Sequence, residues 1–151
     1  MFLSVDNGSA GAVLVIGGDT RKVVIVDRFI WWKPNWDRLR TKLDGFCERY
    51  PMIRAVVCEK PFAVPDRRFH RVGPSQGQDS GRLEEWAREK RLRFLQVPGQ
   101  GKAAAAEAWL QFGTGKGTEH VRDAAAIARA ALAEQKDRKL RAAAEAAGAR
   151  R

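Results

Sequence analysis

The chain has 151 residues, the usual size of one domain and too few for two domains with separate cores. Lys and Arg total 28 against 18 Asp and Glu, so the formal charge is +10 and the pI is about 10.3, while 44% of the residues are hydrophobic. This composition argues against a disordered chain, a membrane-spanning protein or a disulfide framework, and it indicates a folded, basic, cytoplasmic domain whose commonest partner is nucleic acid.

The first third of the chain predicts an antiparallel meander of three strands. Glycine-containing turns separate short runs of apolar residues, and links of this length join antiparallel neighbours. The expected strands are residues 2–6, 12–16 and 22–30.

From residue 34 the apolar spacing changes to that of a helix. Trp36, Leu39, Leu43 and Phe46 recur every three or four residues, and Asn35 can cap the first turn.

The apolar run that follows, residues 53–59, predicts a strand buried on both faces. Because a crossover helix separates it from the first strand, we expect the two strands to pair in parallel.

The second half of the chain predicts one more strand and three more helices. We expect a short strand at residues 92–97, which completes an α/β fold with a five-stranded mixed sheet flanked by helices. The other expected elements are a loop at 63–79, helices at 81–90 and 102–112, a glycine-rich loop at 113–117 and a final helix at 119–134. We place a domain boundary after residue 134, because residues 135–151 form a basic tail of net charge +4, either helical or flexible.

Four ionisable residues occupy unusual places in this arrangement. Asp6 ends the first strand, Glu59 ends the fourth, and His120 and Asp123 lie three residues apart on one face of the last helix. Taken separately, Asp6 is a common turn residue and the His120–Asp123 pair a common surface pair. Together they can place three carboxylates and an imidazole in one small space, which suits two Mg²⁺ or Mn²⁺ ions and phosphodiester hydrolysis.

The sequence resembles the RuvC-type Holliday junction resolvases of the RNase H-like superfamily over residues 2–133. The segments that carry the resemblance are Ser4-Val5-Asp6-Asn7-Gly8-Ser9-Ala10-Gly11, Val56-Val57-Cys58-Glu59-Lys60-Pro61-Phe62 and His120-Val121-Arg122-Asp123-Ala124-Ala125-Ala126-Ile127-Ala128. Each motif is loose by itself, but their order and elements are those of the family. One departure is Asn7, which stands where many relatives have proline.

This resemblance implies an RNase H-like fold and a metal-dependent, structure-selective endonuclease. Asp6, Glu59 and Asp123 would be the catalytic, metal-binding carboxylates, and His120 would occupy the position that holds either a carboxylate or a histidine in the family. Two Mg²⁺ or Mn²⁺ ions per site would serve the paired, symmetric nicking of a four-way DNA junction. A homodimer is implied as well, because a two-fold protein matches that substrate.

Several residues are candidates for contact with DNA. Phe62 matches the aromatic that wedges against bases at the junction centre in the family, although a core phenylalanine is an equally good interpretation. The loop with Arg67, Arg68, Phe69 and Arg71 combines positive charge with a stacking ring, but each arginine taken singly is more often simply solvated. Lys102 and Lys116, both beside glycines, are candidates for a phosphate contact near the site.

Two other functions fit the same residues. Another RNase H-like nuclease, acting on RNA–DNA hybrids or other branched substrates, would share the metal site, since a fold does not determine its substrate. A DNA-binding protein without catalysis is a weaker alternative, because an intact acidic cluster without metal would be electrostatically costly.

Overall fold

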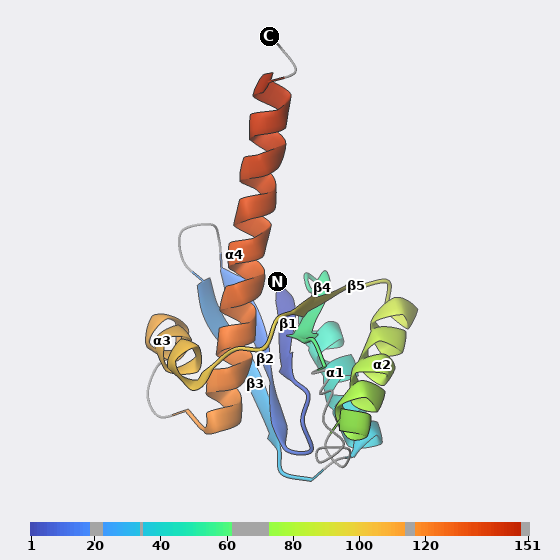
Figure 1. The fold of residues 1–151 in the computed structure, drawn as a ribbon. Helices are drawn as coiled ribbons and strands as arrows, with labels where there is room; N and C mark the ends of the chain where they lie inside the picture. The colour runs from blue at the N-terminus through green and yellow to red at the C-terminus, as the bar shows by residue number, and fades with distance from the viewer. Residues whose placement is uncertain (19–22, 34, 62–72, 114–116, 149–151) are drawn as a thin grey trace.

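The computed structural model describes residues 1–18, 23–33, 35–61, 73–113 and 117–148. Its centre is a five-stranded sheet in the order β3-β2-β1-β4-β5, with helices on both faces (Figure 1). The elements in chain order are β1 (Phe2–Asp6), β2 (Gly11–Gly18), β3 (Val23–Trp31), α1 (Trp36–Arg49), β4 (Ala55–Glu59), α2 (Gly73–Glu89), β5 (Arg93–Val97), α3 (Lys102–Phe112) and α4 (Glu119–Gly148).

The pairing of the strands determines where their ends meet. β1 is antiparallel to β2, and β2 to β3, whereas β1, β4 and β5 are parallel to one another. This is the predicted mixed sheet, so that prediction is confirmed. Val5 pairs with Cys58 in the parallel register of β1 and β4. Asp6 and Glu59, the next residues, therefore end neighbouring strands at one edge of the sheet.

The two faces of the sheet are covered by different kinds of helix. Leu3 and Val5 of β1 face the layer of α1 and α2, whose core contains larger side chains, including Leu43, Phe46 and Trp86. The opposite face packs against α3 and α4 mainly through alanines. Buried Ser4 lies on this face and donates a hydrogen bond to the carbonyl of Ala124, with 2.6 Å between Oγ and O. Small side chains thus let α4 lie directly against the sheet.

The helix α2 begins earlier than predicted. The sequence predicts a loop at residues 73–79, but the helix starts at Gly73, so that prediction is wrong. A proline in the first turn, at position 74, is compatible with a helix. Further along, buried Ser80 accepts a hydrogen bond from Gln96 Nε2 of β5 at 2.9 Å. Contact with the sheet therefore stabilises a glycine-rich segment that local propensity alone would leave irregular.

The helix α4 continues well past the predicted end at residue 134. Between residue 119 and Gly148 the sequence has no proline or glycine and is rich in good helix formers, so nothing local stops the helix. Its last turns project away from the sheet (Figure 1). None of the described helices, α4 included, combines the length and the apolar character needed to cross a membrane.

Candidate active site

The turn after β1 positions Asp6. Trp31 at the end of β3 donates a hydrogen bond from Nε1 to the carbonyl of Gly8 at 3.3 Å. Gly11 closes the turn, and a Cβ there would lie 2.1 Å from the carbonyl oxygen of Asp6 and 2.5 Å from the Trp31 ring. A side chain cannot be placed at residue 11 without moving the backbone, so this glycine is required for the close approach that holds the end of β1.

Three of the four predicted ionisable residues come together at this edge. The Nδ1 atom of His120 lies 2.8 Å from Oδ2 of Asp6, a hydrogen bond between residues 114 positions apart. Asp123 lies one helical turn after His120, and one possible ligand atom from each of the three residues lies within 4.8 Å of the others. The first turns of α4 thus complete a cluster that begins at the end of β1.

Glu59 lies at the side of this cluster rather than within it. Together with Asp6 and Asp123 it lines a hollow of about 210 Å³. One of its carboxylate oxygens, Oε1, accepts a hydrogen bond from the backbone N–H of Gln100 at 2.7 Å. That bond joins the segment after β5 to the carboxylate at the end of β4, and Gln100 lines the same hollow.

The pKa values of two carboxylates in the hollow, Asp6 and Asp123, are raised. Burial raises the pKa of Asp6 to about 6, the negative charges of Asp123 and Glu59 add to the rise, and the hydrogen bond from His120 opposes it. The pKa of Asp123 is also raised, chiefly by burial and then by Glu119. The space holds more negative charge than its own surroundings stabilise, and a bound cation would relieve that excess.

The donor set fits a hard divalent cation. Asp6, Asp123 and Glu59 offer oxygen ligands and His120 one nitrogen, which is the chemistry that Mg²⁺ and especially Mn²⁺ accept. Two lysines of the described residues lie near these carboxylates. Lys60 lines a small hollow together with Asp6 and Glu59. Lys102, at the start of α3, lines the larger hollow. Its side chain is 95% exposed and its Nζ lies 3.9 Å from Glu119, so it stands at the rim of the hollow and leaves the centre open.

Two residues of this site were missed by the sequence analysis. Glu119 lines the same hollow as Asp123, and its position four residues before Asp123 on one helix face was a signal that could have revealed it. Trp32 contacts His120, with 5.8 Å between the ring centroids and an interplanar angle of 70°. No local pattern in the sequence links Trp32 to His120, because the contact joins two distant segments.

The structure places only one of the predicted DNA-contact residues. Lys102 lines the hollow. The remaining six, which come from the segment after β4 and the loop before α4, lie outside the described residues: Phe62, Arg67, Arg68, Phe69, Arg71 and Lys116.

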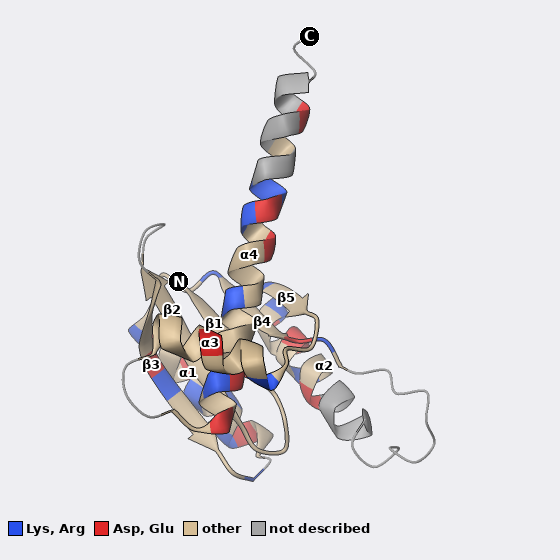
Figure 2. Ribbon diagram, turned by 60° about the vertical axis from the view of Figure 1, so that its left-hand side comes forward, with Lys and Arg blue, Asp and Glu red and all other residues tan. Residues whose placement is uncertain are grey.

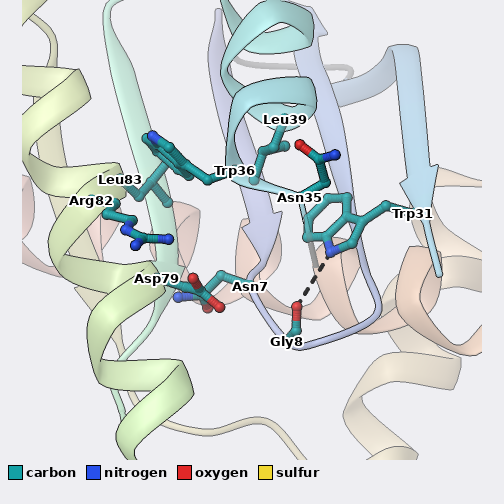
Figure 3. Close-up of a pocket in the computed structure, with 9 residues that line it drawn as sticks. All are labelled: Asn7, Gly8, Trp31, Asn35, Trp36, Leu39, Asp79, Arg82 and Leu83. Atoms are coloured by element: carbon teal, nitrogen blue, oxygen red, sulfur yellow. Dashed lines mark hydrogen bonds between the residues drawn. The ribbon is translucent and has the colours of Figure 1, made fainter. Parts of the chain in front are cut away.

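A second, smaller hollow lies on the other side of the β1–β2 turn (Figure 3). It has a volume of about 90 Å³, and its lining includes Asn7, Asp79 and Arg82, with Asn7 and Asp79 drawn beside each other in Figure 3. Burial raises the pKa of Asp79, and the charge of Arg82 opposes the rise. Because Asn7 follows Asp6 directly, this polar hollow adjoins the turn that carries the first carboxylate of the candidate site.

Comparison with known proteins identifies the fold. No family model matches the sequence, and no curated protein matches it. Among solved structures, T. thermophilus RuvC in complex with Holliday junction substrate has a TM-score of 0.66 at 17% identity, covering 83% of this chain and 88% of that one. A second Thermus thermophilus RuvC structure has a TM-score of 0.62 at 16% identity, covering 83% and 89%. The predicted RNase H-like fold of the RuvC type is therefore confirmed.

Proposed function

We propose that this protein is a metal-dependent, structure-selective endonuclease that resolves four-way DNA junctions by paired symmetric nicks. The observation that carries the proposal is the cluster of Asp6, His120 and Asp123, with Glu59 beside it, at the carboxyl edge of a RuvC-type sheet. The cofactor would be Mg²⁺ or Mn²⁺, two ions per site. One of the similar structures is a complex with a Holliday junction, which supports the choice of substrate.

The four side chains would hold the ions. Bound divalent cations supply an activated water and stabilise the leaving oxygen of a phosphodiester. In this chain, the Asp6–His120 hydrogen bond fixes the imidazole, and the Gln100 N–H fixes the carboxylate of Glu59. Because an imidazole is a softer ligand than a carboxylate, we expect Mn²⁺ to support more activity than Mg²⁺.

The positive charge of the protein would bind the phosphate backbone. The chain has a net charge of +10, and Lys102 at the rim of the acidic hollow is placed to contact a phosphate next to the site. The segments with Phe62, Arg67, Arg68, Phe69, Arg71 and Lys116 remain predicted DNA contacts. A homodimer would present two such sites to the two strands that must be cut, and a cytoplasmic location suits this activity.

A cleavage assay with three substrates tests the proposal. The purified protein is incubated with a labelled four-way junction, a linear duplex with the same arms and an RNA–DNA hybrid, each in Mg²⁺, Mn²⁺ or EDTA. We expect paired nicks in the junction alone, lost in EDTA and in Asp6→Asn. Glu85→Gln, which changes an exposed carboxylate on α2, is the matched control and should retain activity.

Two other results would replace the proposal. Cleavage of the hybrid in preference to the junction would identify an RNA–DNA hybrid nuclease with the same metal site. Tight binding of DNA without metal-dependent cleavage of any substrate would mean that the acidic cluster is not catalytic, and the protein would be a DNA-binding module.

A further inference from the structure

An exposed tryptophan follows β3. Trp32 is 65% exposed, whereas Trp31, Trp86 and Trp109 are buried. Adjacent residues at the end of a strand point to opposite faces of the sheet, and Trp31 belongs to the core under α1 and α2. Trp32 therefore faces the other way, toward α4, and leaves most of its indole ring in solvent.

The exposed ring lies against the candidate metal site. Its contact with His120 joins it to the residue that hydrogen-bonds Asp6. The pairing of Gly11 with Trp31 brings the end of β3 to the turn that follows Asp6. An exposed aromatic ring is thus in direct contact with His120, one of the residues that would bind metal.

Positive charge near Trp32 provides the second feature of a nucleotide-binding surface. Lys33, the next residue, is exposed, and the chain as a whole carries a net charge of +10. Sites for unpaired nucleotides combine an aromatic face, on which a base stacks, with cations that contact the backbone. Single exposed apolar side chains are common on protein surfaces. What distinguishes Trp32 from the exposed Leu110 is its contact with His120 of the candidate metal site.

We propose that Trp32 is a stacking platform for an unpaired base beside the scissile phosphate. A continuous duplex keeps its bases stacked and offers nothing to the ring, whereas a branch point has bases that can leave the stack at low cost. Stacking on Trp32 would then favour branched DNA over linear duplex. This inference rests on the proposed nuclease function and assigns part of its substrate selectivity to one side chain.

Binding without cleavage tests the platform. Affinities for the junction and for the linear duplex are measured in EDTA with the wild type, Trp32→Ala, Trp32→Phe and Leu110→Ala. Leu110 on α3 is 84% exposed and serves as the control for loss of an exposed apolar side chain. We expect Trp32→Ala to weaken junction binding about tenfold and duplex binding by less than about twofold, with Trp32→Phe close to the wild type and Leu110→Ala unchanged.

Intrinsic fluorescence provides a direct readout of stacking. Trp32 is the most exposed of the tryptophans that the structure describes, so the part of the emission lost in Trp32→Phe reports on it. We expect the junction to quench that part in the wild type and the linear duplex to leave it largely unchanged. Quenching of equal size in Trp32→Phe would overturn the proposal.

The remaining outcomes separate this proposal from the nuclease function. Junction binding by Trp32→Ala equal to that of Leu110→Ala, in a wild type that cuts junctions, would overturn the platform and leave the nuclease in place. A Trp32→Ala protein that binds junctions normally but loses Mn²⁺ affinity in calorimetry would show that the ring positions His120 instead, which also overturns it. A wild type that cuts no DNA but shows quenching dependent on Trp32 would support the platform and reject the nuclease.

Discussion

The two halves of α4 are both rich in alanine but have different surroundings. Residues 119–132, the buried half, include a run of covered positions from Ala124 to Ala128 and carry His120 and Asp123. Residues 133–148, the projecting half, are exposed at every position whose side chain is described, and both acidic and basic residues occur along them (Figure 2). Both halves are rich in alanine, so helix propensity does not distinguish them.

The difference lies in what each half contacts. In the buried half, alanines permit the close approach to the sheet that brings His120 within hydrogen-bonding distance of Asp6. In the projecting half, the two alanines whose side chains are described, Ala133 and Ala142, are exposed to solvent. Polar residues in the buried half consequently pair with other elements, as His120 does with Asp6 of β1 and Arg129 with Glu107 of α3. In the projecting half, Glu134 pairs with Arg138 along the helix itself.

The largest expected effect is on catalysis. Asp123→Asn should lower the rate of junction cleavage in Mn²⁺ by at least about 100-fold, because loss of a direct ligand exceeds the 10- to 100-fold cost typical of its supporting partners. Asp137→Asn makes the same chemical change in the projecting half and should leave the rate within about twofold. Equal losses in both variants would contradict the assignment of catalysis to the buried half.

Removing the buried charge should stabilise the protein without metal. The pKa of Asp6 is about 6 in the folded protein, whereas its ordinary value is 3.8. The unfolded chain therefore loses this proton at a lower pH than the folded protein does. The free energy of unfolding consequently falls as pH rises from 3.8 to 6, by about 3 kcal/mol in total. In EDTA, Asp6→Asn should therefore unfold at higher denaturant than the wild type at pH 8, and the difference should vanish near pH 4. Added Mn²⁺ should reverse the order at pH 8, because the wild type alone gains binding energy. A variant less stable than the wild type at pH 8 in EDTA would refute this account.

A change in side-chain size tests the packing of the two halves. Ala124→Leu adds three carbons at a fully buried position next to the Ser4 hydrogen bond, and overpacking of this kind costs about 1–3 kcal/mol. Ala142→Leu makes the same change at an exposed position, where about 0.5 kcal/mol or less is expected. Denaturant unfolding of both variants measures the difference, and similar destabilisation would mean that the projecting half is covered in solution.

The smallest effect is expected from deleting the tail. A chain ending at Glu134 should keep its thermal unfolding midpoint within about 2 °C, because every side chain that the structure describes in the removed part of α4 is exposed. Residues 135–151 carry a net charge of +4, so junction binding should weaken and its salt dependence should become less steep. Affinity measured at several salt concentrations checks this. A large loss of stability would place residues 135–151 inside the folded domain and reject the boundary after residue 134.

The local pattern of the sequence accounts for much of the fold and for the positions of the four ionisable residues. Alternating and 3.6-residue periods mark the strands and helices, and short glycine turns require an antiparallel meander before the parallel pair. Asp6 and Glu59 follow directly, since an ionisable residue at the end of a buried strand is visible in the sequence itself. These features are predictable because each depends on neighbours a few residues away.

The start of α2, the cluster around Asp6 and the position of Trp32 depend on contacts between distant segments, so only the tertiary structure determines them. The sheet stabilises α2 through Ser80 and Gln96 over residues that would otherwise be irregular. The approach of α4 to the sheet converts a common helix-surface pair into a cluster with Asp6 that raises the carboxylate pKa. The end of β3 brings Trp32 to His120. The sequence alone can show that a carboxylate lies at the end of a strand. The burial and the charge repulsion that raise its pKa arise only when folding brings distant side chains together.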